Sequence, residues 1–216
     1  MSFKKFSNSG LLFLVFIFYT LTVKLFDVKP IGPQGSEVGF ATINGFVAKI
    51  FKYNDLFYDL TKVIALIAFL YIGAFAIMGL VQLIKKKSFA KVDLAIYGMA
   101  GIYALTAMFY ILFEILIINY RPVLDEGELE ASYPSSHTML AVSVFGCALV
   151  YFLERLKAST LKTILVIASG VFAFLMAFGR LISGVHWFTD ILGGVILGCA
   201  ITSFYWAFVK CSKPTE

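Results

Sequence analysis

The sequence predicts an all-α integral membrane protein, a bundle of six transmembrane helices that forms a single domain over residues 1–216. Hydrophobic residues make up 60% of the chain and charged residues only 14%, whereas soluble domains usually carry about 25% charged residues. The mean hydropathy of +0.89 agrees. The apolar residues gather into six runs, each near the roughly 20 residues that a helix needs to cross a bilayer. No linker rich in proline or serine separates a second domain.

The first apolar run covers Leu11 to Phe26 and follows Lys4 and Lys5. This order is similar to a signal peptide, but no small-residue cleavage site follows, so we expect a retained anchor helix. After a loop rich in proline and glycine, apolar residues recur at helical spacing from Val38 to Tyr53. The pattern predicts a short amphipathic helix on the membrane surface. It either packs at the interface or covers a lipid site as a lid.

Five further apolar runs have the length of a membrane span. They cover Leu56–Ile84, Leu94–Asn119, Ser136–Phe152, Leu161–Phe178 and Phe188–Val209. Their connections are short, as expected for neighbouring helices of one bundle.

Basic residues set the predicted orientation, because Lys and Arg are enriched on the cytoplasmic side of membrane proteins. With the N-terminus inside, 11 of the 18 basic residues lie on the inner side, namely Lys4, Lys5, Lys85, Lys86, Lys87, Lys91, Arg155, Lys157, Lys162, Lys210 and Lys213. The acidic loop from Asp125 to Glu130 then falls outside. The net charge of +5 is thus explained by anchoring at membrane lipids and not by nucleic-acid binding. We expect a bacterial plasma membrane protein with both termini in the cytoplasm.

Both histidines of the chain lie at the outer ends of predicted spans. His137 begins the fourth span, and His186 sits at the turn into the sixth. Arg121 ends the third span, and Arg180 follows the fifth. The topology therefore brings both histidines and two of the three arginines to one face of the membrane, away from the cytoplasm.

These residue types suit phosphoryl transfer, because the two arginines offer planar forks that match phosphate oxygens. Ser135 or Ser136 can cap the fourth helix, whose free N–H groups and dipole favour an anion. His186 and Asp190 are four residues apart and so share one helical face. The carboxylate can then orient the imidazole for attack on phosphorus, or it can simply cap the helix N-terminus. His137 is placed to protonate the leaving oxygen.

Three short motifs carry a family resemblance. They are Arg121-Pro122, then Pro134-Ser135-Ser136-His137, then Arg180 with His186 and Asp190. Together they resemble the signature motifs of the type-2 phosphatidic acid phosphatase superfamily. The resemblance implies that His137 is the general acid, that His186 is the nucleophile, and that Asp190 orients it.

The chain departs from the family pattern at three positions. Ser136 stands where the family usually has Gly, and Gly179 stands where it usually has Ser. The largest departure is Glu114, which replaces a phosphate-binding Lys seven residues before the first-motif Arg.

Seven helical residues would place Glu114 on the same face as Arg121, about 10 Å deeper. A bare carboxylate there is costly, so we expect it to be protonated or paired with Lys62, Arg121 or Arg180, or with a cationic substrate head group. Our hypothesis is that Glu114 tunes substrate binding and does no chemistry.

The predicted function is that of a lipid phosphatase acting through a phosphohistidine, on phosphatidate, phosphatidylglycerophosphate or a polyprenyl diphosphate. No metal or cofactor is expected, since no cluster of carboxylates or histidines has metal-ligand spacing. A lipid phosphotransferase with the same intermediate is the alternative. A non-enzymatic membrane protein with a decayed site is a third class, favoured only by Glu114. The related vanadate-binding peroxidases are soluble, so the composition argues against them.

Overall fold

The computed structural model describes residues 6–212. Within this range six helices are long and apolar enough to cross a membrane, and no β-strand is present. They are α1 (Ser7–Leu25), α3 (Asp55–Lys86), α4 (Leu94–Ile115), α5 (Ser136–Arg155), α6 (Thr160–Ile182) and α7 (Phe188–Cys211). The predicted all-α, multi-pass membrane fold is confirmed. Lys4, Lys5 and Lys213, which enter the predicted orientation, lie outside the described residues.

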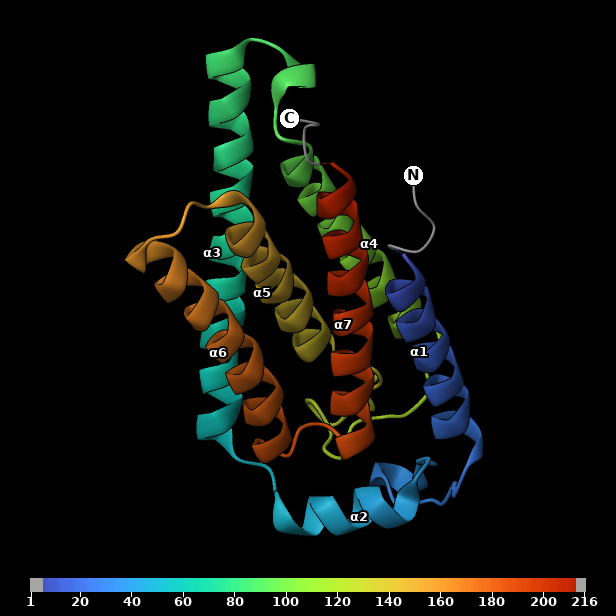
Figure 1. Cartoon of the computed structure of the whole chain (residues 1–216). Helices are drawn as coiled ribbons and strands as arrows, with labels where there is room; N and C mark the ends of the chain where they lie inside the picture. Colours follow the sequence, from blue (N-terminus) through green and yellow to red (C-terminus); the bar gives the residue numbers. More distant parts are fainter. Residues whose placement is uncertain (1–5, 213–216) are drawn as a thin grey trace.

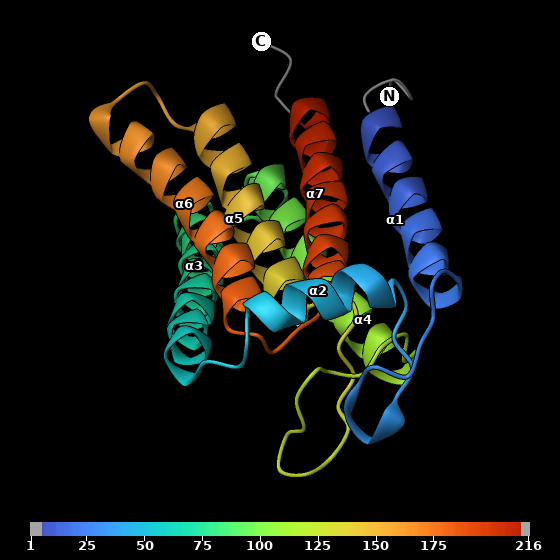
Figure 2. The same ribbon diagram turned by 90° about the horizontal axis from the view of Figure 1, so that it is seen from below.

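The predicted surface helix is α2 (Ala41–Ile50). It runs across one end of the bundle, nearly perpendicular to the spanning helices (Figures 1 and 2). Ile43, Phe46 and Ile50 follow helical spacing and are exposed on it, which suits a helix that rests in the membrane interface. Two short 3-10 turns, η2 (Pro33–Gly35) and η3 (Phe89–Lys91), complete the elements.

The centre of the bundle is the pair α5 and α7. In the most apolar stretch of each helix, 61% of α5 and 50% of α7 is buried, against at most 22% of the other spanning helices. The two backbones approach closely where α7 carries glycine, because a Cβ on Gly194 would lie 2.8 Å from the Ser135 carbonyl oxygen. The remaining helices therefore present most of their apolar surface to lipid.

Helix α3 is the longest element, with 32 residues. It packs against α4, α5 and α6. It extends past its neighbours at the end of the bundle opposite α2 (Figure 1). The run Lys85-Lys86-Lys87 stands at this projecting end.

Two predicted helix ends at this end of the bundle differ from the structure. Helix α4 stops at Ile115 and not at Asn119, because Asn119 is drawn into a loop where its backbone carbonyl accepts from Ser132 N at 2.9 Å. Helix α6 continues past Phe178 to Ile182. Its stop signal is Gly184, whose φ of +67° is the left-handed conformation common after a helix end.

Gly184 also joins α2 to the bundle. A Cβ there would lie 2.6 Å from the backbone carbon of Lys52, so only glycine fits against the segment that follows α2. Beside it, Asn54 N donates to the Ser183 carbonyl at 3.0 Å. The turn between α6 and α7 is therefore fixed to the surface helix.

Candidate active site

The predicted site residues converge at the end of the bundle where α2 lies. The N-termini of α5 and α7, the C-terminus of α6 and the loop 116–135 all meet there (Figure 2). A cavity of about 750 Å³ reaches from this point between α3, α4 and α5, and its mouth carries Glu114, Arg121, Ser136 and His137. Its deeper wall is largely apolar, with Ala65, Phe69, Ile72, Tyr103 and Leu140. A polar mouth above an apolar wall suits a lipid with a charged head group.

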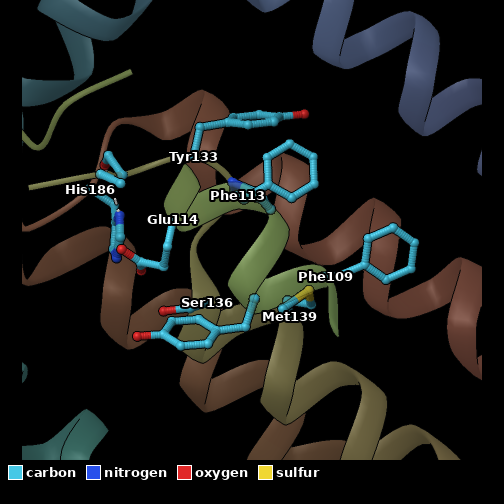
Figure 3. A pocket seen from close by; sticks show the side chains of 11 residues that line it. Phe109, Phe113, Glu114, Tyr133, Ser136, Met139 and His186 are labelled. Carbon is cyan, nitrogen blue, oxygen red and sulfur yellow. Dashed lines mark hydrogen bonds between the residues drawn. The ribbon is translucent and has the colours of Figure 1, made fainter. Parts of the chain in front are cut away.

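A smaller pocket adjoins this cavity and reaches His186. Glu114 and Ser136 line both spaces. Figure 3 shows the Glu114 side chain pointing towards the His186 ring, with Ser136 nearby. Arg121 and Ser136, both predicted to bind phosphate, and the two histidines come from separate motifs, and they line two adjoining spaces.

His186 is 5% exposed, and each ring nitrogen has a polar neighbour. Arg180 Nη2 lies 3.0 Å from Nε2, and Ser132 Oγ lies 3.0 Å from Nδ1. An arginine can only donate, so Nε2 is the acceptor and carries no proton. Burial first, and then the charges of Arg180 and Arg121, hold the pKa of His186 well below its usual 6.5. The imidazole is therefore neutral, with an Nε2 lone pair facing the arginines.

Asp190 is completely buried and accepts three hydrogen bonds. Trp187 N and Ser132 Oγ donate to Oδ2 at 3.0 and 2.5 Å, and Asn119 Nδ2 donates to Oδ1 at 3.2 Å. The bond from Trp187 N is part of a capping box at the start of α7. Helix capping, the simpler interpretation of Asp190, thus coexists with its position beside His186.

The predicted helical pairing of His186 with Asp190 was wrong in its geometry. His186 precedes the first residue of α7, Phe188, so the two residues do not share a helical face. Nδ1 lies 3.9 Å from Asp190 Oδ2, beyond hydrogen-bond distance. Ser132, which no sequence signal identified, sits between them.

Arg180 is fully buried at the end of α6. Nη1 donates to Thr61 Oγ1 at 3.3 Å, and the guanidinium stacks over the Tyr58 ring at 5.2 Å. Both partners come from the first turns of α3, a contribution that the sequence did not predict. The arginine is thus held rigidly with its fork towards His186.

Arg121 is held by carboxylates of its own loop. Its Nη1 lies 2.9 Å from Glu130 Oε2 and 3.7 Å from Asp125 Oδ2. The loop folds back through a bridge between Tyr120 and Ala131. Glu130, another residue that the sequence did not single out, is therefore the carboxylate closest to this arginine.

The N-terminus of α5 carries the second motif. Ser135 is the N-cap residue, but its side chain caps no helix N–H. Instead Ser135 Oγ accepts from Thr138 Oγ1 at 3.0 Å, so the predicted side-chain cap was wrong for Ser135. Ser136 and His137, in the first turn of this helix, line the cavity, and the free N–H groups of a helix N-terminus favour an anion.

Glu114 does not have the partner expected for it. Helix α4 ends at Ile115, so helical spacing does not relate Glu114 to Arg121, although both line the cavity. Within residues 6–212 Glu114 has no ion pair with a basic side chain. Its neighbour is Tyr110, which lines both spaces beside it. The carboxylate is exposed to the cavity.

Three buried nitrogen atoms at this site have no hydrogen-bond partner in the described part of the chain. They are Nε of Arg121, Nε of Arg180 and Nδ1 of His137. Unpartnered buried donors are rare, and these gather where two guanidinium groups, a helix N-terminus and a neutral imidazole meet. The arrangement can bind a tetrahedral oxyanion and present a nucleophile to it. No group of three metal-ligating side chains occurs in residues 6–212.

Comparisons with known proteins agree with this arrangement. The family model described as the PAP2 superfamily matches residues 71–213. Phosphatidylglycerophosphatase B of Bacillus subtilis is 35% identical over 81 residues, so the match spans only 39% of that protein and 37% of this chain. The crystal structure of a transmembrane PAP2 type phosphatidylglycerolphosphate phosphatase from Bacillus subtilis superposes with a TM-score of 0.68, over 96% of this chain and 98% of that one, at 21% identity. At that identity the likeness is one of fold.

Proposed function

Because the chain belongs to the PAP2 superfamily, we propose that it is an integral membrane lipid phosphatase that acts on phosphatidylglycerophosphate. The observation that supports this most is the hydrogen bond from Arg180 to Nε2 of His186. It identifies an unprotonated nitrogen beside a phosphate-binding group. The whole chain, 1–216, acts as one membrane-embedded phosphatase domain.

The phosphate group binds between Arg121, Arg180 and the N-terminus of α5. Arg121 exchanges Glu130 for phosphate oxygens, and Arg180 turns its Nη2 from His186 to the same phosphate. Ser135 and Ser136 stand at the helix end, whose N–H groups complete the anion site. These donors supply the positive field in which we propose hydrolysis proceeds without a metal.

Hydrolysis runs through a phosphohistidine. Nε2 of His186 forms a bond to phosphorus as the bond from phosphorus to the lipid oxygen breaks, and His137 gives its proton to that oxygen. His137 then takes a proton from water as the water oxygen bonds to phosphorus and the P–N bond breaks. Asp190 keeps His186 oriented through both steps, and orthophosphate leaves.

Glu114 favours phosphatidylglycerophosphate among the lipid phosphates. Its carboxylate repels a phosphate, and no cation of residues 6–212 pairs with it. A substrate that donates a hydrogen bond to the carboxylate offsets this repulsion. The glycerol between the two phosphates of phosphatidylglycerophosphate carries a hydroxyl, whereas phosphatidate and polyprenyl diphosphates carry none. The names of the matched Bacillus subtilis proteins support the same substrate.

The catalytic end faces away from the cytoplasm of a bacterial plasma membrane. The basic residues at the opposite end of the bundle support this orientation. They are Lys85, Lys86, Lys87, Lys91, Arg155, Lys157, Lys162 and Lys210. Because such residues favour the cytoplasmic side, both termini lie inside.

The test is a panel of lipid phosphates incubated with purified protein, with released orthophosphate as the readout. Phosphatidylglycerophosphate should give the highest kcat/KM, and activity should survive a chelator. His186→Ala should lose at least about a thousandfold in rate, since it removes the nucleophile. His137→Ala should slow mainly substrates with poor leaving groups.

Two results would contradict the proposal. One is acid-labile phosphate trapped on His137 instead of His186. The other is radiolabel that moves from the substrate into a second lipid instead of water, which identifies a phosphotransferase. Matching thermal unfolding of each variant and the parent protein excludes loss of fold as the cause.

A further inference from the structure

We propose that Ser132 is a positioning residue that connects His186 to Asp190, so that the carboxylate acts on the nucleophile through a hydroxyl and not directly. The proposal rests on the function proposed above. It assigns a task to a residue that lies outside the three short motifs of the family resemblance.

The distances exclude a direct hydrogen bond between the imidazole and the carboxylate. His186 Nδ1 and Asp190 Oδ2 are 3.9 Å apart. Ser132 Oγ lies between them, 3.0 Å from Nδ1 and 2.5 Å from Oδ2. The serine is 2% exposed, so the three groups form a chain of hydrogen bonds shielded from water.

The direction of each proton follows from what the groups can donate. Arg180 occupies Nε2 as a donor, so the ring proton is on Nδ1. A carboxylate accepts only, so the Ser132 hydroxyl gives its proton to Asp190 and accepts from Nδ1–H. Ser132 therefore keeps the same tautomer when Arg180 turns to the phosphate, and so leaves Nε2 free to attack.

The serine is held in place by the backbone of its loop. Ser132 N donates to the Asn119 carbonyl at 2.9 Å. The Asn119 side chain in turn donates to Asp190 Oδ1 at 3.2 Å. Asn119 and Ser132 flank the bridge from Tyr120 to Ala131. The loop that carries Arg121 thus also sets the position of Ser132.

Attack on phosphorus creates a positive charge on the His186 ring. The Nε2 lone pair forms the P–N bond, the Nδ1 proton stays on the ring, and the leaving oxygen takes its proton from His137. The Ser132 hydroxyl, polarised by Asp190, then faces a cation, and hydrogen bonds that involve charged groups are the stronger ones. When water cleaves the P–N bond, His186 returns to the neutral Nδ1–H form.

The first measurement reports the tautomer and needs no substrate. In the His137→Asn variant His186 is the sole histidine, and its two ring nitrogens can be observed by ¹⁵N NMR. We expect a protonated Nδ1 and an unprotonated Nε2 with Ser132 present. Adding Ser132→Ala should remove the acceptor of Nδ1–H, so the signal of that proton should move upfield and exchange faster with water. An unchanged Nδ1–H signal after this substitution would overturn the proposal, whatever reaction the protein catalyses.

The second measurement is kinetic. Ser132→Ala should lower kcat by roughly 10- to 100-fold, the range for a lost hydrogen bond to a charged group, with KM changed less than about twofold because phosphate contacts remain. Ser132→Thr, which keeps the hydroxyl, should recover most of the rate. Ser143→Ala is the matched control, since Ser143 is fully buried in α5 and its hydroxyl has no partner in residues 6–212.

A double-mutant cycle with Asp190→Asn tests whether Ser132 and Asp190 act through one chain of hydrogen bonds or independently of each other. Ser132→Ala combined with Asp190→Asn should cost no more than Asp190→Asn alone. Strictly additive losses would contradict the proposal. A parent protein that releases no phosphate from any lipid would instead refute the proposed function and leave the NMR result as the deciding one for Ser132.

Discussion

His186 is a histidine whose charge the fold suppresses. Its pKa lies well below 6.5 because it is buried and faces Arg180 and Arg121. In the proposed mechanism the neutral imidazole is the nucleophile, so the competent fraction should stay near one as the pH falls from 8 to 6. We predict that the ring carbon signals of His186 in NMR spectra do not titrate over this range, whereas free histidine added as a reference does. A midpoint near 6.5 would show that the ring is not buried as described.

The lowered pKa of His186 makes the folded chain less stable in acid. The unfolded chain binds a proton at His186 near pH 6.5, and the folded chain does so only at lower pH. Stability from the neutral imidazole is therefore complete above pH 6.5 and declines as the pH falls towards the folded pKa.

Glu114 is expected to tune binding and to do no chemistry. Glu114→Gln removes a charge that repels phosphate, so turnover should persist and orthophosphate should inhibit roughly 2- to 10-fold more strongly. The preference for phosphatidylglycerophosphate over phosphatidate should shrink. Steady-state kinetics with phosphate inhibition measures both, and Glu128→Gln, outside the cavity lining, is the control. A variant as inactive as His186→Ala would mean that the carboxylate takes part in the reaction.

At the residue scale, the sequence predicted the charged groups better than the neutral ones. Motif spacing placed Arg121, Arg180 and His186 together because such residues at span ends have few structural alternatives. Ser132 and Asn119 carried no such signal, since serine and asparagine are ordinary in loops. Their roles depend on how the loop 116–135 folds back, which local patterns do not specify.

Helix α2 is an element that the catalytic end depends on. Asn44 is fully buried, and its amide donates to the Gly39 carbonyl at 2.7 Å and to Thr189 Oγ1 at 2.9 Å. Its carbonyl oxygen accepts from Thr189 N at 3.2 Å. Because Thr189 is in the first turn of α7, Asn44 satisfies a helix N–H that lacks a partner within its own helix.

Asn44→Ala should therefore lower the free energy of unfolding by about 1–3 kcal/mol, the cost of unsatisfied buried groups. Thermal unfolding in detergent should show a Tm lower by several degrees. Asn8→Ala, at an exposed position of α1, should leave Tm unchanged. Equal Tm values for the two variants would show that α2 is only loosely attached.

Helix boundaries illustrate what the sequence leaves open at this scale. Hydropathy located all six spans but ended α6 at Phe178, one residue before Gly179, whereas the helix continues to Ile182. A glycine can be tolerated inside a helix, and the chain reverses only at Gly184, where φ is positive. The extra turn carries Arg180 into the bundle. A boundary error of four residues thus decides whether this arginine is a surface group or a buried one.

In the whole molecule, the apolar pattern indicates which segments span the membrane but not which of them lie at the centre of the helix bundle. The two most apolar helices, α3 and α6, are among the least buried, whereas α5 is the most buried. Lipid accepts any apolar side chain, while contact between helices requires small residues and polar pairs. The central position of α5 and α7 follows from their glycine contacts, which a count of apolar residues does not reveal.

Orientation is tested on the intact cell, in a variant whose three cysteines, Cys147, Cys199 and Cys211, are replaced. A new cysteine at Glu128, in the acidic loop, should react with an impermeant thiol reagent, and one at Ser88 should react only after lysis. Glu128 is preferable to Gly127, whose φ of +89° resists a side chain. The reverse labelling pattern would place the catalytic end in the cytoplasm.

The length of α3 has a consequence for the membrane around it. Thirty-two residues make a helix about 48 Å long, and the hydrocarbon core of a bilayer is only about 30 Å thick. Such a helix projects or tilts according to the lipid it meets. Its first turns hold Thr61 and Tyr58 against Arg180, so a change of tilt moves the residues that support the arginine for which we propose phosphate binding.

Bilayer thickness should therefore act on turnover without any ligand. In vesicles of short-, medium- and long-chain phosphatidylcholine, kcat should pass through a maximum, and Thr61→Ala, which cuts the contact, should flatten the curve. A flat response of the parent protein would mean that α3 projects freely and transmits nothing. If the maximum is found, a cell that lengthens or shortens its acyl chains also changes the turnover rate of this protein.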